Sequence, residues 1–321
     1  MDTSGRRGFV AGMAAGGLLA GLGGSVRADA AGPRPRRMTR DLICGNLGVK
    51  ATQGEAIDLA SRHGFESVFP DAGELGRLSD AELRDLLVEM KAKGLVFGAG
   101  FLAVDFRKDD AIFERGLADL PGFARGLQRA GVLRVGTWLP PASDTFTYRQ
   151  YFALHVRRLR EVARVLQDHE LRLGLEYVGP KTAWASRRYP FLHTLAETRE
   201  LIAEIGAANV GFVLDSWHWY HAGDSAADVA ALRNQEVVAV DLNDAPAGVA
   251  KDQMVDSARE LPLATGVIDV AAFLKALAAI GYDGPVRAEP FNEGVRKMPR
   301  EEAVAAAAQA MKRAFALVEA D

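Results

Sequence analysis

The chain has 321 residues, of which 49% are hydrophobic and 25% charged, which is typical of globular proteins. Its formal net charge of −3 shows no basic excess of the kind that nucleic-acid-binding domains direct at phosphates, so we expect no nucleic-acid partner. The single cysteine, Cys44, excludes an intrachain disulfide.

Residues 1–30 have the pattern of an export signal. A pair of arginines, Arg6 and Arg7, precedes an apolar stretch rich in Gly and Ala, and a small-x-small cleavage pattern follows. The pair with Phe9 resembles a twin-arginine signal, although Gly stands where Ser or Thr usually precedes the pair. The apolar stretch is shorter than the roughly 20 residues of a spanning helix, so a stable membrane anchor is the less favoured alternative. We therefore expect export to the periplasm or secretion, with residues 31–40 as a linker.

From residue 41 onward, short apolar runs alternate with longer amphipathic segments. The apolar runs that predict strands lie at 41–47, 65–70, 95–102, 132–138, 172–178, 209–215, 236–242 and 286–290. Apolar residues at helical spacing lie between them, as at 81–90 and 148–169. Glycines typical of helix C-termini follow several of these segments: Gly64, Gly94, Gly131, Gly206 and Gly281.

Eight such units of strand and helix predict an α/β fold, a (β/α)8 TIM barrel formed by residues 41–321 as one catalytic domain. The continuous apolar runs fit parallel strands that helices cover. A doubly wound sheet is the alternative fold. The longest predicted loops, 179–190 and 243–268, follow strands that carry carboxylates, and loops of this length are usually functional.

Four acidic residues stand at the ends of four successive predicted strands: Glu176, Asp215, Asp241 and Glu289. In a TIM barrel the C-terminal ends of the strands form the active site, so these side chains would lie close together. Close carboxylates repel one another and take up protons unless a cation intervenes. Oxygen ligands favour Mn²⁺, with Mg²⁺ or Co²⁺ as alternatives, over Zn²⁺. Any one of these acids taken alone could instead cap a helix or form a surface salt bridge.

Other candidates for the site follow strand ends. His218 lies three residues after Asp215 and could bind the metal or hold a substrate hydroxyl. Trp138 and Trp217 could pack against the C–H faces of a sugar, although each could serve ordinary packing. Arg259 lies in a long loop, where it could hold a substrate oxygen or remain solvated.

Three motifs carry a resemblance to a known family. They are LDSWH at 214–218, VDLNDAP at 240–246 and GYDGPVRAEPF at 281–291. They resemble sugar phosphate isomerase/epimerases of the xylose isomerase-like superfamily, and the resemblance covers roughly residues 41–295.

The resemblance implies a metal site of Glu, Asp, His and Glu around Mn²⁺ or a similar ion. Glu176, Asp215 and Glu289 match three of these positions. The position of the histidine falls on Asp241, which can bind the metal in a more acidic site or lie outside its coordination sphere. In ketose epimerases of the family the two glutamates also transfer the proton and the histidine after the aspartate contacts the substrate, which implies these roles for Glu176, Glu289 and His218.

The expected function is therefore a divalent-metal-dependent sugar isomerase or epimerase that acts on a keto-sugar or sugar derivative through an enediolate. Loss of a β-hydroxyl from the same enediolate would make the enzyme a lyase or dehydratase of a keto-sugar, keto-inositol or keto-glycoside. A non-catalytic carbohydrate-binding barrel is the third alternative. Relatives of this kind are often homo-oligomers, so a homo-oligomer is possible by analogy.

Overall fold

The computed structural model describes residues 37–319, all of which belong to one compact unit. The predicted export signal at 1–30 and the first six residues of the predicted linker lie outside the described residues. Thr39 and Arg40, the last two residues of that linker, already belong to the first strand. No helix within residues 37–319 is both long and apolar enough to cross a membrane.

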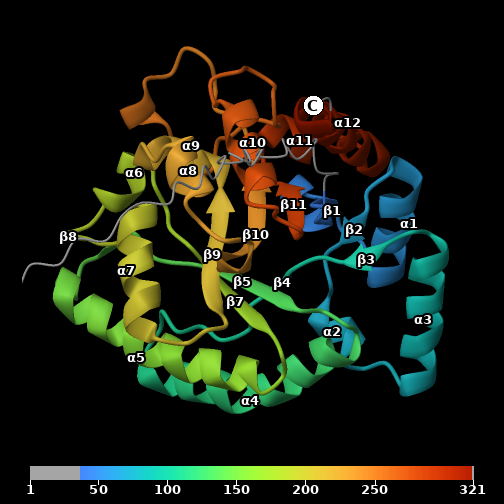
Figure 1. Cartoon of the computed structure of the whole chain (residues 1–321), viewed down its shortest axis with the longest axis horizontal. Coiled ribbons are helices and arrows are strands. Elements are labelled where there is room, and N and C mark those ends of the chain that lie inside the picture. Colours follow the sequence, from blue (N-terminus) through green and yellow to red (C-terminus); the bar gives the residue numbers. More distant parts are fainter. Residues whose placement is uncertain (1–36, 320–321) are drawn as a thin grey trace, which may run out of the picture. The chain divides into compact units, whose positions relative to one another are not determined.

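Nine strand segments form one parallel sheet that closes on itself (Figure 1). In sheet order they are β3 (Val96–Phe97), β2 (Ser67–Val68), β1 (Thr39–Leu42), β11 (Pro285–Ala288), β10 (Val237–Leu242), β9 (Val210–Asp215), β7 (Arg172–Glu176), β5 (Arg134–Trp138) and β4 (Gly100–Phe101). The two outermost segments, β3 and β4, are consecutive pieces of the single run predicted at 95–102. The sheet therefore has eight strand positions, which confirms the TIM barrel and excludes the doubly wound alternative.

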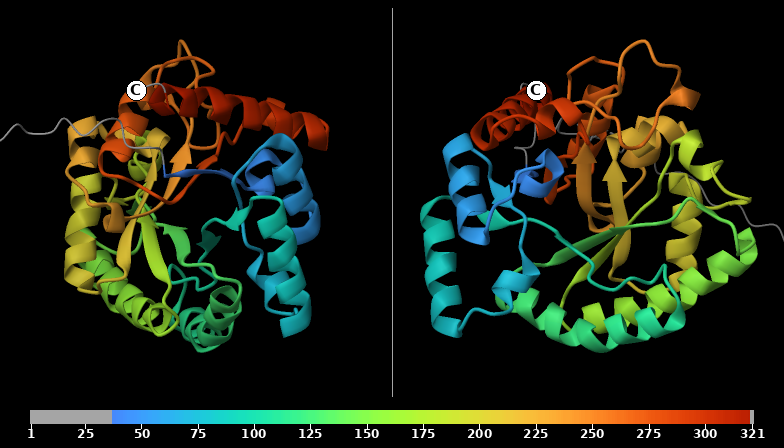
Figure 2. Two further views of the ribbon diagram at one scale, coloured as in Figure 1. Left: turned by 45° about the vertical axis from the view of Figure 1, so that its right-hand side comes forward. Right: turned by 180° about the vertical axis from the view of Figure 1, so that it is seen from behind.

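Helices surround the strands (Figures 1 and 2). The longer ones are α1 (Gln53–His63), α3 (Asp80–Ala92), α4 (Asp110–Arg129), α5 (Tyr148–Gln167), α7 (Leu195–Ile205), α10 (Val270–Ala279) and α12 (Arg300–Glu319). The shorter elements are η1 (Cys44–Leu47), α2 (Ala72–Leu75), α6 (Lys181–Trp184), α8 (Ser216–Ala222), α9 (Ala226–Ala230), η2 (Asn234–Glu236), η3 (Lys251–Gln253) and α11 (Glu293–Arg296). A separate antiparallel pair joins β6 (Ala142–Ser143) to β8 (Tyr189–Pro190).

Local chemistry fixes the helix boundaries. Helix α1 begins with a capping box in which the Thr52 side chain accepts from the Glu55 backbone and the Glu55 carboxylate accepts from the Thr52 backbone. The helix is capped by Gly64, which follows its last residue and has a left-handed φ of 74°. All five glycines predicted at helix ends have positive φ. The first predicted strand was too long, because residues 44–47 form the turn η1 instead.

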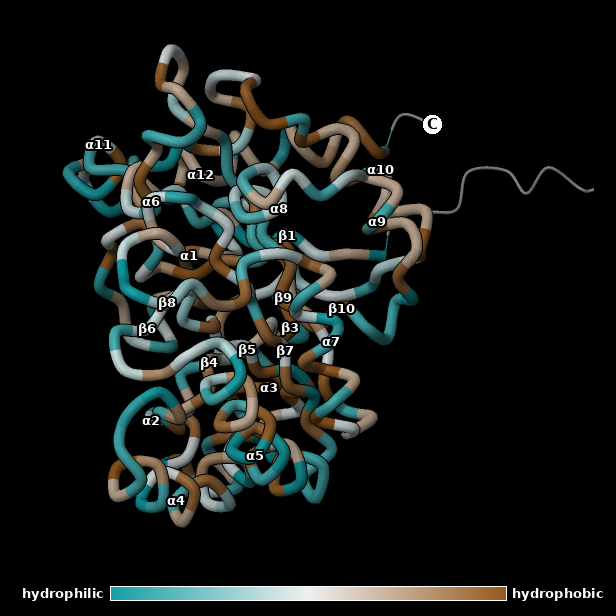
Figure 3. The backbone as a smooth tube through the Cα atoms, turned by 90° about the vertical axis from the view of Figure 1, so that its left-hand side faces the viewer, coloured by the Kyte–Doolittle hydropathy of each residue, from teal (hydrophilic) through white to brown (hydrophobic). Residues whose placement is uncertain are grey.

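The interior of the barrel is tightly packed at the level of Val213. Figure 3 draws β9 largely in brown, and every residue of this strand is buried. Val213 from β9 packs beside Gly136 and Gly174 of the two preceding strands, and a Cβ added to Gly174 would lie 2.7 Å from its Cγ2 atom. Such close packing closes the barrel below its C-terminal end and leaves that end open for a site.

The two long loops predicted from the sequence carry short elements of their own. The loop at 179–190 contains α6 and β8. The loop at 243–268 is fixed by Asp244, whose carboxylate accepts the backbone N–H groups of Ala245, Thr265, Gly266 and Ile268. This anchor holds the loop over the ends of β9 and β10, where it delivers Arg259 to the acidic cluster described next.

Candidate metal and substrate site

The ends of four strands bring the predicted acids together. Glu176 is the last residue of β7 and Asp215 the last residue of β9. Asp241 lies near the end of β10, in register with Asp215 across the sheet. Glu289 directly follows β11. All four side chains therefore lie at the C-terminal end of the barrel, largely removed from solvent.

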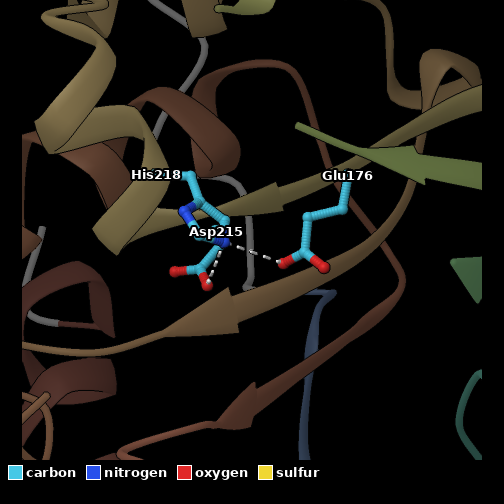
Figure 4. Close-up of side chains that lie close together, drawn as sticks. All are labelled: Glu176, Asp215 and His218. Carbon is cyan, nitrogen blue, oxygen red and sulfur yellow. Dashed lines mark ion pairs between the residues drawn. The ribbon is translucent and has the colours of Figure 1, made fainter. Parts of the chain in front are cut away.

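Two overlapping triads have the spacing of a metal site, and Glu176 belongs to both. Glu176, Asp215 and His218 each offer one ligand atom, and these atoms lie within 4.8 Å of one another (Figure 4); the same holds for Glu176, Asp241 and Glu289. His218 Nε2 lies 3.8 Å from Glu176 Oε1 and 3.7 Å from Asp215 Oδ2. Two ligands of one ion, each about 2.1 Å from it, lie roughly 3–4 Å apart, so the spacing fits.

Arg259 lies inside the acidic cluster. Its Nη1 donates to Asp215 Oδ2 and to Glu289 Oε2, both at 2.7 Å, and its Nη2 donates to Asp256 Oδ1 at 2.8 Å. The predicted substrate-binding arginine thus offsets part of the charge of two predicted ligands. Its ring neighbour Trp217, 5.6 Å from the guanidinium carbon, is fully buried.

Arg287 holds Asp241 from a second direction. Its Nε and Nη2 donate to the two carboxylate oxygens of Asp241 at 2.5 Å and 2.9 Å, and both side chains are buried. This bidentate pair gives both oxygens of Asp241 a cationic partner, whereas Arg259 pairs with one oxygen each of Asp215 and Glu289. The role of Asp241 as a metal ligand stays a prediction. Both of its oxygens already have a cationic partner, which leaves them less available to a metal ion.

The cluster still carries excess negative charge. Burial raises the pKa of Glu176 well above its ordinary value, and the carboxylates of Glu289, Asp241 and Asp215 raise it further. Burial and Asp241 raise the pKa of Glu289 to about 8, and burial raises that of Asp215 to about 7. Glu176 Oε1 is buried and has no hydrogen-bond partner. The residues therefore fit a bound divalent cation, which would neutralise carboxylates that otherwise hold protons.

His218 is a neutral donor in this arrangement. Burial lowers its pKa to about 3. Its Nδ1 accepts the backbone N–H of Gly179 at 3.3 Å, which places the proton of the neutral ring on Nε2. Nε2 lies 3.5 Å from Arg259 Nη2 and beyond hydrogen-bond distance of Glu176 and Asp215. A proton on Nε2 favours contact with a substrate oxygen over metal ligation. Gly179 permits this contact because a Cβ there would lie 2.4 Å from the His218 carbonyl oxygen.

Two adjoining cavities flank the cluster and share the walls formed by Trp138, Glu176 and Glu289. The His218 lobe, about 330 Å³, is also lined by His218, Asp256, Arg259, Pro141, Val178, Ala183 and Phe291. The Arg287 lobe, about 290 Å³, is also lined by Arg287, Arg107, Thr137, Phe101, Leu102, Gly136 and Val213. Trp138 is 48% exposed at the shared rim, where a ligand can reach it, whereas Trp217 lines neither lobe.

Sequence reasoning missed three charged residues of the site. Arg287 stands two residues before Glu289, and strand alternation places both on one face, so this residue could have been found. Asp256 lies three residues before Arg259 in a loop whose path no periodicity predicts. Arg107 follows the third strand position in a segment without a recognisable motif.

The family comparison agrees with this geometry. The family described as xylose isomerase-like TIM barrel matches residues 57–314. Among curated proteins, the chain is 32% identical to the 3-dehydroshikimate dehydratase of Pseudomonas aeruginosa over 149 residues, which is 46% of this chain and 22% of the relative. It is 27% identical to the inosose isomerase of Bacillus subtilis over 149 residues, which is 46% of this chain and 49% of the relative. The matches thus span less than half of these relatives' own lengths.

Solved structures extend the likeness over most of the chain. A xylose isomerase domain protein from Alicyclobacillus acidocaldarius is 32% identical, with a TM-score of 0.77 over 88% of this chain and 99% of that one. The IOLI protein with a bound zinc atom is 20% identical, with a TM-score of 0.71 over 88% of this chain and 98% of that one, a likeness of fold. The closed eight-position barrel, the carboxylates at its C-terminal end and the match over residues 57–314 lead to one conclusion: the chain belongs to the xylose isomerase-like TIM barrel family.

Proposed function

We propose that this protein is a divalent-metal-dependent enzyme that isomerises or epimerises a keto-sugar or sugar derivative through an enediolate. The observation that carries the proposal is Glu176 Oε1. This buried carboxylate oxygen has no hydrogen-bond partner, and further carboxylates surround it. Two cavities of suitable size for a small sugar open beside it, with Trp138 at their rim.

Glu176 would hold the ion together with Asp215 from one triad and Glu289 from the other. Asp241 would stay outside its coordination sphere because Arg287 already pairs with both of its oxygens. The oxygen donors favour Mn²⁺, with Mg²⁺ or Co²⁺ as alternatives, and the zinc of the IOLI protein adds a further candidate. Such an ion supplies polarisation of a substrate carbonyl and stabilisation of the negative charge that develops on it.

The glutamates would carry the proton. Burial and the neighbouring carboxylates raise the pKa of both Glu289 and Glu176, which strengthens each as a base toward a substrate C–H group. A bound ion would lower both pKa values. Removal of the proton from the carbon beside the carbonyl gives the enediolate. Return of the proton to the opposite face of the same carbon gives the epimer, and return to the neighbouring carbon gives the isomer. His218 Nε2–H is positioned in the His218 lobe to donate to a substrate oxygen.

A dehydratase is the second candidate, which the 32% identity to a 3-dehydroshikimate dehydratase favours. Loss of a β-hydroxyl from the same enediolate would give an enone. A carbohydrate-binding barrel without catalysis would bind ligand and leave its C–H bonds intact.

Deuterium exchange tests the proposal. The Mn²⁺-loaded protein is incubated with a panel of keto-sugars in D₂O and followed by NMR. We expect deuterium at the carbon beside the carbonyl, and an enone signal would select the dehydratase. Glu289→Gln should slow exchange about 100-fold or more, because the variant cannot transfer the proton.

The matched control is Glu293→Gln, which removes the same charge from an exposed helix position nearby. This variant should exchange like the unaltered protein. If sugars of the panel bind but none takes up deuterium, only the non-catalytic carbohydrate-binding barrel remains as an alternative. Mn²⁺ that neither binds nor stabilises the protein would remove the basis of the enzyme proposals.

A further inference from the structure

We propose that the Arg287 lobe binds a carboxylate of the substrate, so that the substrate is a keto-sugar acid. The inference rests on the proposed function and names its substrate class. It starts from two guanidinium groups, those of Arg107 and Arg287, which line one cavity beside the catalytic carboxylates.

Arg287 has donors that the protein leaves unused. Asp241 accepts from Nε and Nη2, which form one edge of the guanidinium plane. Nη1, on the opposite side, is buried and has no hydrogen-bond partner. The end of the guanidinium that Nη1 and Nη2 form therefore keeps parallel N–H groups, and this fork matches the two oxygens of a carboxylate.

Arg107 supplies a second cation at the rim of the same lobe. Its guanidinium packs 4.3 Å from the ring centroids of both Phe106 and Trp138. It donates to the Trp138 carbonyl oxygen and to Thr137 Oγ1. These contacts fix the group in place. Its Nη1 also donates to Asp105 Oδ1 at 3.4 Å, and this partner is 40% exposed. The protein therefore offsets the charge of Arg107 only in part, because solvent screens the pair.

A bound cation next to the lobe makes an anion in it more favourable. Glu176 and Glu289 are the two acids that line the lobe, and both form walls shared with the proposed ion site. When the ion neutralises them, the remaining charges are Arg107 with its exposed partner Asp105, and Arg287 with the buried carboxylates of Asp241 and Asp41. A neutral hydroxyl would only accept a hydrogen bond from Arg287 Nη1. A carboxylate would accept this bond and also form an ion pair with Arg107.

The two lobes would then bind different functional groups of the substrate. The carbonyl and its neighbouring hydroxyl would lie by Glu176, Glu289 and the His218 lobe. The carboxylate, separated from the carbonyl along the carbon chain, would lie between Arg107 and Arg287. A hexulosonic acid with the ketone near one end and the carboxylate at the other has this arrangement.

Matched ligand pairs test the inference. D-fructuronate differs from D-fructose, and D-tagaturonate from D-tagatose, only by a carboxylate in place of a terminal hydroxymethyl group. Isothermal titration calorimetry on the full Mn²⁺-loaded protein should give at least tenfold tighter binding of the uronate in one of the pairs. In Arg107→Gln the uronate should bind no more than about threefold more tightly than the neutral sugar. Arg129→Gln, which removes an arginine paired with exposed Asp80, should keep the full preference for the uronate.

Arg287 needs a variant that keeps the barrel folded. Removing it alone would leave Asp241 buried without its partner, so Arg287→Met is combined with Asp241→Asn. The double variant should also lose the preference for the uronate. Equal binding within both pairs, absent uronate binding, or a preference that survives in both variants would overturn the inference.

The outcomes separate this inference from the proposed function. Deuterium exchange into neutral ketoses without a carboxylate preference would leave the enzyme proposal standing and remove the carboxylate site. A carboxylate preference that depends on Arg107, without exchange into any ketose or uronate, would support the site and overturn the enzyme proposal.

Discussion

Single side chains in the cluster differ in how fully the protein satisfies them. Asp241 accepts two hydrogen bonds from Arg287. Asp215 accepts from Arg259 on one oxygen and from Trp217 and Asn243 on the other. Glu176 Oε1 has no hydrogen-bond partner. Asp215 accepts more hydrogen bonds than Asp241, but only one of its oxygens pairs with a cation, whereas both oxygens of Asp241 pair with Arg287. Because a metal ion gains least from oxygens that already have a cationic partner, we expect Glu176 to matter most and Asp241 least.

A comparison of two aspartate variants tests this order. Asp241→Asn should leave the dissociation constant for Mn²⁺ within about threefold, because Asp241 is already paired. The same change should lower the free energy of unfolding by about 3–5 kcal/mol, since it leaves the Arg287 charge buried without a partner. Asp215→Asn should weaken Mn²⁺ binding at least tenfold. Calorimetry gives the affinities and urea denaturation gives the stabilities.

Asp85→Asn on the exposed face of α3 is the control for removal of one negative charge. His218→Gln belongs to the same series, because a donor to substrate, unlike a metal ligand, can be lost without loss of the ion. Mn²⁺ affinity that falls as far in Asp241→Asn as in Asp215→Asn would return Asp241 to the coordination sphere.

At the scale of single elements, helix α5 shows what periodicity can and cannot predict. Its apolar spacing predicted the helix, and residues such as Val156 and Leu159 are buried as expected. The same face also buries His155 and Arg158, which a reading of apolar residues alone passes over. His155 Nδ1 meets the Tyr151 carbonyl oxygen at 2.8 Å, and its Nε2 is buried without a partner. The ring must therefore be neutral in the folded protein.

This buried histidine predicts a loss of stability in acid. Burial lowers the pKa of His155 to about 4, whereas the unfolded chain has a value near 6.5. The unfolded state therefore binds the proton first, and the contribution of His155, present above pH 6.5, is lost as the pH falls toward 4. Between pH 7 and pH 5 the loss is about 2 kcal/mol. In urea denaturation, His155→Phe should show a correspondingly smaller drop in stability over this range.

Other buried histidines shift in the same direction, so only the difference between the two proteins reports on His155. His63→Gln serves as the comparison, since its partly buried ring pairs with the exposed Glu301. An equal pH dependence in His155→Phe and the unaltered protein would mean that this ring protonates without unfolding.

The strands and their acids were accessible from the sequence because each depends on local pattern. Eight apolar runs placed the eight strand positions, and the alternation of strand and helix placed Glu176 and Glu289 at one end of them. The partners of these acids were not accessible in the same way. Arg259 reaches Asp215 across 44 residues and a loop held by Asp244, a contact that depends on the folded path of the chain. The cationic partners of these acids are therefore known only from the tertiary structure. The ranking of the metal ligands depends on these partners, so it could not be predicted from the sequence.

At the scale of the whole barrel, the interior packing that supports the site depends on glycines in adjacent strands. Val213 on β9 points into the barrel, and its Cγ2 would lie 2.9 Å from a Cβ added to Gly136 on β5. Val213 forms a small buried cluster with Ala99 and Ala239 from the third and seventh strand positions. Small residues on neighbouring strands thus make room for the branched side chain of Val213 in the interior of the barrel.

A double-mutant cycle tests this packing. Gly136→Ala should lower the free energy of unfolding by about 1–3 kcal/mol, because the new methyl group overlaps Val213 and the strand cannot retreat. Val213→Ala should cost about 2 kcal/mol through lost packing. The double variant should be at least about 1 kcal/mol more stable than the sum of the two effects predicts, since each change relieves the other. Gly54→Ala, where an added Cβ meets nothing within 4 Å, is the control and should be neutral or stabilising. Strict additivity in urea denaturation would show that the barrel absorbs the methyl group elsewhere, and the interior would then not be the rigid support that the site requires.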